Sequence, residues 1–194
     1  TADNFSNTTL SMAYEHPFNR NQSMNFTLNL AHLDNIETDQ FDIDNVRGEL
    51  SYNWGNEVHR FKHGISTGKV NLDQNGFQKS FALNSSWQRA GENGWYQSLS
   101  GSYTQVRYDT SNGGDLNDLR DVDQVLFTAG VTKIAGPLTH TLSVYTADES
   151  PEAEAGGDHN GRSFTGLAYS LLYRMNGQHT PFLRTSFQEV EHDS

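Results

Sequence analysis

Apolar and polar residues alternate with a period of two along most of the chain. Between residues 46 and 54, apolar residues and one glycine occupy the even positions, and polar residues occupy the odd ones. Because successive side chains of a strand point to opposite faces, this alternation predicts strands with one apolar and one polar face. Ten such runs can be followed, through Leu10-Met12-Tyr14, Met24-Phe26-Leu28-Leu30, Val46-Gly48-Leu50-Tyr52-Trp54, Phe61-His63-Ile65, Phe81-Leu83-Trp87, Leu99-Gly101-Tyr103, Val125-Phe127-Ala129-Val131, Leu138-Leu142-Val144, Leu167-Tyr169-Leu171-Tyr173 and Leu183-Thr185-Phe187.

The connections between these runs predict the order of the strands. After odd-numbered runs they are short and carry Gly, Pro or Asn, at residues 17–22, 55–57, 90–94, 134–137 and 174–178. After even-numbered runs they are longer and mostly acidic, as at residues 34–44, 109–121 and 147–161. This alternation places the short turns at one end of an up-and-down meander and the long loops at the other. No linker interrupts the pattern, so residues 1–194 are expected to form a single domain.

The same asymmetry favours a membrane barrel over a soluble sandwich. Outer-membrane barrels have tight turns at one end and long loops at the other, whereas sandwich strands cross between sheets through connections of mixed length. The expected fold is therefore all-β, an up-and-down antiparallel transmembrane β-barrel, with about ten strands present as part of a larger barrel. The chain begins without an initiator Met and ends in a polar stretch after the last run, so we expect truncation at both ends.

All three Trp residues and several Tyr residues lie beside the short turns. Such rings favour the interface between membrane and water, because they are partly apolar and partly hydrogen-bonding. This predicts an aromatic girdle formed by Tyr14, Trp54, Trp87, Trp95 and Tyr173. The alternative interpretation is that these rings close the base of a soluble core.

The polar positions of the strands are rich in Ser, Thr, Asn and Gln. Small polar residues of this kind are typical of a hydrated or plugged barrel interior, whereas the solvated face of a sandwich commonly carries many Lys and Glu residues. The residues predicted to line this lumen are Arg47, Glu49, Asn53, Lys62, Ser100, Thr141 and Arg184. A sheet face exposed to bulk water is the alternative.

Composition and motifs narrow the function classes. No stretch approaches the roughly 18 consecutive apolar residues of a membrane-spanning helix. A net charge of −11 argues against a nucleic-acid partner, because a phosphate backbone would be repelled. The absence of cysteine excludes disulfides and thiolate metal sites. Residues 64–68 have the Gly-x-Ser-x-Gly spacing but lie within a strand run rather than at a strand-to-helix elbow, and no phosphate-binding loop occurs, so we expect no enzymatic activity and no cofactor.

Histidines and acid clusters do not predict a metal site. His59 and His63 share a strand face, but four residues along a strand span about 13 Å, which is too far for one zinc ion. Two acidic clusters offer oxygen ligands for Ca²⁺ but lack the glycine and terminal glutamate of an EF-hand loop. Solvated acidic loops are the favoured interpretation of both clusters. The first cluster consists of Asp39, Asp42 and Asp44, and the second of Asp115, Asp118, Asp121 and Asp123.

Three short stretches carry a family resemblance. Residues 13–18 (Ala-Tyr-Glu-His-Pro-Phe), 120–124 (Arg-Asp-Val-Asp-Gln) and 158–167 (Asp-His-Asn-Gly-Arg-Ser-Phe-Thr-Gly-Leu) resemble the barrel domain of surface lipoprotein assembly modifiers. In that family, periplasmic tetratricopeptide-type repeats precede the barrel, and nothing in this chain matches those repeats. The resemblance implies movement of a lipoprotein cargo across the bacterial outer membrane. A barrel in that membrane is expected to contact membrane lipid and lipopolysaccharide. It transfers no catalytic residue.

The sequence therefore leaves three alternative functions open. The first is an integral outer-membrane barrel for translocation or surface assembly of a cargo, which by the resemblance is a surface lipoprotein. The second is a porin or polysaccharide-export barrel, distinguished by whether helical repeats precede it. The third is a soluble glycan-binding β-sandwich that uses exposed Trp and Tyr residues and folds without detergent.

Overall fold

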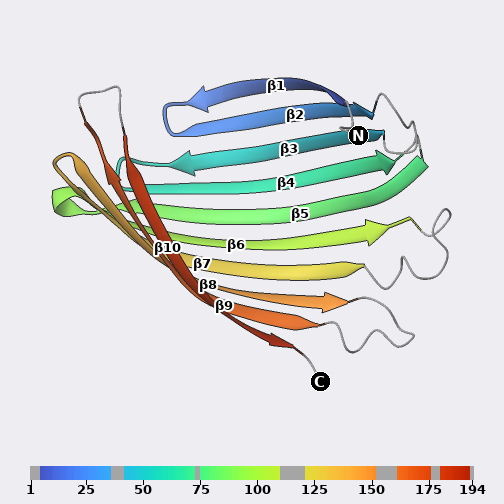
Figure 1. Ribbon diagram of the computed structural model, residues 1–194. Coiled ribbons are helices and arrows are strands. Elements are labelled where there is room, and N and C mark those ends of the chain that lie inside the picture. The colour runs from blue at the N-terminus through green and yellow to red at the C-terminus, as the bar shows by residue number, and fades with distance from the viewer. Residues whose placement is uncertain are drawn as a thin grey trace.

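The computed structural model of the chain describes residues 5–35, 42–72, 75–109, 121–151, 161–175 and 180–192. Within them, ten strands form one antiparallel sheet in which every strand pairs with its neighbour in sequence (Figure 1). The predicted all-β, up-and-down antiparallel arrangement is confirmed. The strands are β1 (Phe5–Asn19), β2 (Gln22–Asn35), β3 (Ile43–Gly55), β4 (His59–Leu72), β5 (Asn75–Ala90), β6 (Trp95–Tyr108), β7 (Val122–Ala135), β8 (Leu138–Pro151), β9 (Arg162–Tyr173) and β10 (Phe182–His192).

The short turns lie at one end of the sheet, opposite the longer connections (Figure 1). Between β5 and β6 the turn is the 3-10 helix η2 (Glu92–Gly94), and no helix in the described part of the chain is long and apolar enough to span a membrane. Asn93 and Gly136 have positive φ values of 55° and 59°. Asparagine and glycine tolerate this left-handed backbone, which allows the chain to reverse within a few residues.

One connection departs from the predicted alternation of short and long. β4 continues to Leu72 and β5 begins at Asn75, so only residues 73 and 74, which lie outside the described residues, separate them. The expectation of a long connection after every even-numbered strand is wrong here. The apolar alternation stops near Ile65 because Lys69 and Lys79 occupy the same face further along, yet strand pairing continues through these two lysines.

The sheet is curved but open. Among the described residues, β1 pairs only with β2 and β10 only with β9, so the expected closure into a barrel is not seen in this structure. The two stacked sheets of a sandwich are not present in the described ranges either. A single sheet has no second layer to cover it, and both of its faces stay accessible.

The sheet has almost no buried apolar core. Ala147 is the one described apolar side chain that is buried, whereas Leu10, Phe127 and Phe187 are 62%, 56% and 70% exposed. Exposing so many large apolar side chains to water is unfavourable, and extended apolar surfaces of this kind mark contact with a membrane or another molecule. The arrangement of these side chains therefore defines the surface to be explained.

Candidate functional site

The pairing register sorts the side chains into two faces. We call the face that carries Leu50 the apolar face and the face that carries Ser51 the polar face. Residues that lie directly opposite one another across neighbouring strands form rows, and alternate rows belong to the same face. The row through Leu50 crosses all ten strands, as Tyr14, Phe26, Leu50, Ile65, Leu83, Tyr103, Val125, Asp148, Ser163 and Glu191.

The five residues of the predicted aromatic girdle all lie on the apolar face, towards the turn end. They do not share one row. The row of Tyr14 on β1 reaches β9 at Ser163, and Tyr173 lies ten residues further along β9. The line of aromatic residues is therefore inclined to the rows, and it moves ten residues while it crosses eight strand-to-strand steps.

The charged residues at the loop end of the apolar face follow a second inclined line. We call this line the charged border, and it is formed by Asp44, Lys69, Lys79, Arg107, Asp123, Asp148 and Glu189. The row of Glu189 on β10 reaches β3 at Tyr52, which is eight residues along β3 from Asp44. The border thus moves eight residues over the seven steps from β3 to β10, in the same direction as the aromatic line.

These two slopes correspond to a strand tilt. A residue advances about 3.3 Å along a strand and neighbouring strands lie about 4.8 Å apart, so the charged border is inclined by about 38° and the aromatic line by about 41°. On β7 the charged Asp123 and Lys133 are ten residues apart and enclose four apolar side chains on this face. Ten residues along a strand tilted by 38° give a band about 26 Å high.

All seven residues predicted to line a lumen lie on the polar face. Asn53, Lys62 and Ser100 share one row, and Thr141 and Arg184 share another. Lys62 donates a hydrogen bond of 2.9 Å to Glu49, an ion pair between neighbouring strands. The structure thus gathers these residues on one surface, in groups on β3 and β4 and on β8 to β10, with Ser100 on β6 between them.

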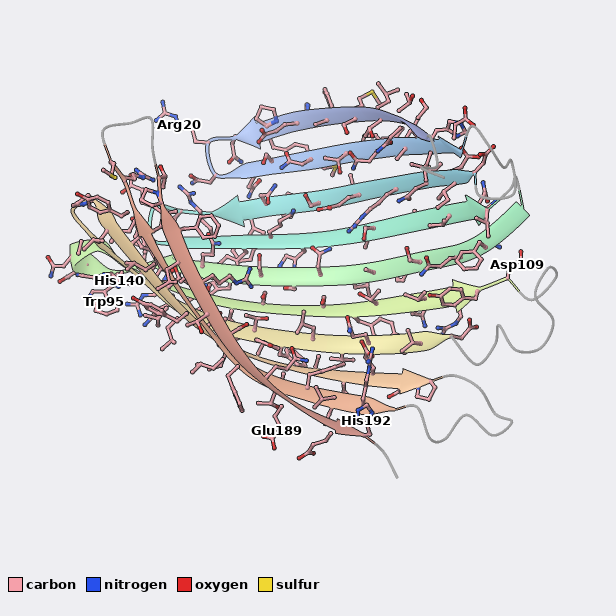
Figure 2. All side chains as sticks on the ribbon, in the orientation of Figure 1. Arg20, Trp95, Asp109, His140, Glu189 and His192 are labelled. Carbon is pink, nitrogen blue, oxygen red and sulfur yellow. The ribbon has the colours of Figure 1, made fainter. Side chains whose placement is uncertain are left out.

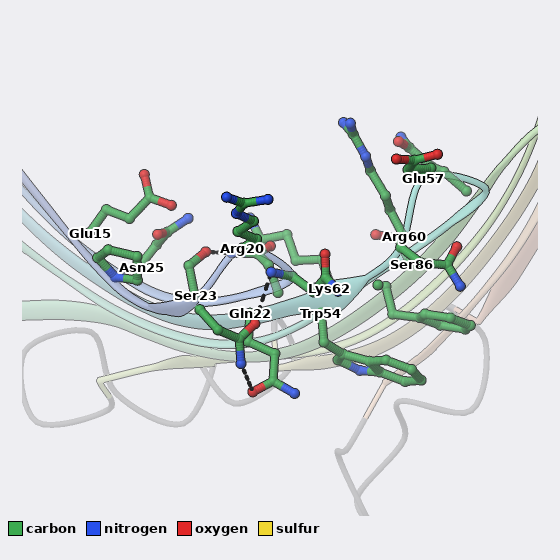
Figure 3. A pocket seen from close by; sticks show the side chains of 18 residues that line it. Glu15, Arg20, Gln22, Ser23, Asn25, Trp54, Glu57, Arg60, Lys62 and Ser86 are labelled. Atoms are coloured by element: carbon green, nitrogen blue, oxygen red, sulfur yellow. Dashed lines mark hydrogen bonds between the residues drawn. The ribbon is translucent and has the colours of Figure 1, made fainter.

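The polar face is the concave side of the curved sheet at its turn end. Figure 3 shows Arg60 and Lys62 on the inner side of the ribbon and Trp54 on the outer side. The inner side holds a polar hollow of about 800 Å³, to which Glu15 and Arg20 also contribute. The concave surface is therefore hydrophilic while the convex surface is apolar, and charges of both signs lie close together at the turn end.

Side-chain networks occur at the charged border. On β7, Asp123 accepts a hydrogen bond from the Tyr103 hydroxyl (2.5 Å) and forms an ion pair with Arg107 (2.6 Å). Beyond the apolar residues of β2, His32 lies 2.8 Å from a carboxylate oxygen of Asp44. This hydrogen bond raises the pKa of His32 above its ordinary value of 6.5.

Figure 2 shows Trp95 and His140 close together at the turn end and Asp109 at the loop end. Trp95 and His140 belong to one row, in which Lys133 lies between them. The Lys133 ammonium lies 4.9 Å from the centre of the Trp95 ring. A cation over an aromatic face is attracted by the electron-rich ring. Polar and aromatic groups thus meet at this edge of the apolar band.

The residues considered as metal ligands have separate partners. His59 lies 3.2 Å from the Trp87 indole nitrogen, which donates to it, and His63 lies 3.0 Å from the Ser85 hydroxyl. Asp121 accepts a hydrogen bond from the Tyr108 backbone nitrogen. No group of three metal-ligating side chains occurs among the described residues, and Asp39, Asp115 and Asp118 lie outside them.

Two relationships on this sheet were not predicted from sequence. Tyr145 reaches over Gly166 to Gln188, and Lys69 lies directly opposite Lys79. The alternation places the two lysines on the apolar face, which was a usable signal. Their pairing, however, depends on the register between β4 and β5.

Comparison with known proteins adds no assignment. No protein-family model matches the sequence, and no curated protein matches it. The functional proposal therefore rests on the geometry of the two faces.

Proposed function

We propose that the chain is the wall of a transmembrane β-barrel in a bacterial outer membrane, and that it serves as a conduit or translocation platform rather than as an enzyme. Lipid would cover the convex apolar face, and the concave polar face would enclose a hydrated interior. Additional strands between β1 and β10 would complete the barrel.

The inclined apolar band is the observation that supports this proposal best. Strands of a closed barrel tilt by about 35–45° to the barrel axis, so a band that is level in the membrane must climb across the hydrogen-bonded rows. The slopes of about 38° and 41° fall within that range, and the band height of about 26 Å matches the roughly 25 Å apolar belt of outer-membrane barrels. If a second sheet covered the apolar face in place of lipid, it would give no reason for this inclination or for this band height.

The chemistry of the polar face supports a passive surface. Hydroxyl side chains fill the centre of β6 on this face, at Ser98, Ser100, Ser102 and Thr104, and the row of Ser100 continues through Ser86 and Thr128 on the neighbouring strands. Such groups exchange hydrogen bonds with water or with a moving solute, and none of them is activated by a neighbouring base in the described contacts. The face is suited to guiding a hydrated cargo.

The cargo proposal depends on the family resemblance, which implies a surface lipoprotein. A porin or polysaccharide-export barrel would have the same two faces. These two functions are distinguished by expressing the full reading frame in a Gram-negative host that lacks this gene. Surface display of a co-expressed lipoprotein supports the first, whereas uptake of small solutes without lipoprotein display supports the second.

Tryptophan depth tests the membrane proposal. The full-length protein is folded into phosphatidylcholine vesicles with one of Trp54, Trp87 or Trp95 retained, and fluorescence quenching is compared for lipids brominated near the glycerol or near the chain end. We expect all three to be quenched best from the glycerol region, because the aromatic line lies at the interface. A tryptophan introduced by Leu83→Trp, at mid-band, is the control and should be quenched best near the chain end.

Absence of quenching at all four positions would overturn the membrane proposal. So would a result in which the three native tryptophans lie at clearly different depths, because a level aromatic line is what the inclined geometry requires. A protein that stays soluble and folded without detergent would instead favour the glycan-binding alternative.

A further inference from the structure

We propose that Lys69 and Lys79 form a binding site for the phosphate groups of lipid A, the membrane anchor of lipopolysaccharide. This inference rests on the proposed function, because it places the two lysines at the outer edge of a lipid-facing surface. It adds a specific ligand and a specific position to that function.

The register brings the two lysines together. Lys69 on β4 and Lys79 on β5 are directly opposite one another on the apolar face, and both side chains are exposed. Arg107 on β6 is directly opposite Lys79, so three bases occupy one row on three adjacent strands. In a chain with 13 bases among 194 residues and a net charge of −11, such a row concentrates positive charge against the overall balance.

The ion pairs of this region leave the lysines as the available charges. Arg107 is paired with Asp123 at 2.6 Å, and Asp121 lies 3.9 Å away. Within the described residues, neither Lys69 nor Lys79 forms an ion pair. The Asp109 carboxylate and the Lys69 side chain both border Gly76.

Two like charges directly opposite one another across a strand pair repel, and the arrangement destabilises the sheet unless an anion lies between them. Lysine ammonium groups bind phosphate as compact point charges. A phosphate held by both lysines removes the repulsion and gains two charge-assisted hydrogen bonds. The lysine pair is thus better explained by a bound anion than by the sheet itself.

The position of the pair selects the anion. Both lysines lie on the charged border at the loop end, beyond the apolar residues Ile65 and Phe81. In outer-membrane barrels the long loops are extracellular, so this border meets the head groups of the outer leaflet. A ligand here needs acyl chains against the apolar face and phosphates at the lysines, which is the chemistry of lipid A.

Binding of lipid A to the full-length protein in detergent tests the site. We compare the protein, the Lys69→Gln/Lys79→Gln variant, and an Arg89→Gln/Lys133→Gln control that removes two bases from the apolar face at the turn end. The lysine variant should bind about thirtyfold more weakly, because each basic side chain near an anionic membrane surface contributes about fivefold. The control should bind within about twofold of the parent protein.

Three results would overturn the proposal. Equal weakening in both variants would show a general charge effect, and no weakening in the lysine variant would show that the pair takes no part. Equal competition by phosphatidylglycerol or by inorganic phosphate would remove lipid A as the ligand. Flotation of the same proteins with phosphatidylcholine vesicles is measured in parallel, so that a protein that inserts but ignores lipid A refutes only the site, and one that fails to insert refutes the membrane proposal.

Discussion

The Tyr145 hydroxyl donates a hydrogen bond of 2.9 Å to the Gln188 side-chain oxygen, although their strands β8 and β10 are separated by β9. The contact is possible because Gly166 lies directly opposite Tyr145 and directly opposite Gln188. A Cβ at Gly166 would clash with the Tyr145 ring. The tyrosine therefore lies flat over the glycine and links three strands on the polar face.

Replacing Gly166 by alanine should displace the Tyr145 ring and break its hydrogen bond to Gln188. We expect the free energy of unfolding to fall by about 2 kcal/mol, from overpacking and the lost hydrogen bond together. Urea unfolding of the protein in phospholipid vesicles measures it. Gly48→Ala is the matched control, because nothing lies within 4 Å of a Cβ there, and it should leave stability unchanged or slightly raised.

A charge in the middle of the apolar band should be poorly tolerated. Leu83→Arg places a guanidinium on the convex face between Lys79 and Arg89, where we expect a cost of about 2–4 kcal/mol in folding into vesicles. Asn84→Arg, one residue away on the concave face, serves as the control. Similar costs for the two variants would contradict the assignment of the faces.

The absence of native cysteine allows the two faces to be mapped by single cysteines. In membrane-inserted protein, a water-soluble maleimide should label Ser100→Cys rapidly, because Ser100 lies on the hydrated polar face. It should label Leu99→Cys slowly, because lipid covers the apolar face. The labelling rates are measured by mass spectrometry, and faster labelling at residue 99 would reverse the proposed orientation.

Strand tilt is measurable without a variant. Polarised infrared spectroscopy of the full-length protein in oriented bilayers should give an average strand tilt of about 40° from the membrane normal. The inclinations of the charged border and of the aromatic line both require this tilt. An average tilt below about 20° would contradict the inclined geometry, because a level apolar band would then follow the rows.

The His32 and Asp44 contact should respond to pH. Because Asp44 favours the protonated imidazole, the pKa of His32 is raised, and the contact stabilises the fold at low pH and is lost as the pH rises through that raised pKa. His32 lies beyond the apolar band, so its ring is accessible to titration. An NMR titration of its ring protons should show a lower pKa in Asp44→Asn. An unchanged value would rule out this carboxylate as the cause.

Much of the fold could be predicted from the chain itself. Alternation assigns Leu99 and Ser100, or Leu83 and Asn84, to opposite faces because successive side chains of any strand diverge, whatever their partners. The same local rule placed all seven lumen candidates together and all five girdle residues on the other face. The alternation rule failed to predict the strand residues between Ile65 and Phe81. Strands β4 and β5 continue there beyond the apolar band, where apolar and polar residues no longer alternate.

Tertiary structure decided how the strands are aligned. The opposition of Lys69 and Lys79, the reach of Tyr145 over Gly166, and the inclination of the charged border all depend on pairing register, which is set by hydrogen bonds between strands and not by the side-chain alternation within one strand. A shift of two residues between two neighbouring strands would keep every side chain on its face and change which residues meet across that pair. The sequence by itself determined which side chains share a face, and the pairing of the strands determined which of them meet.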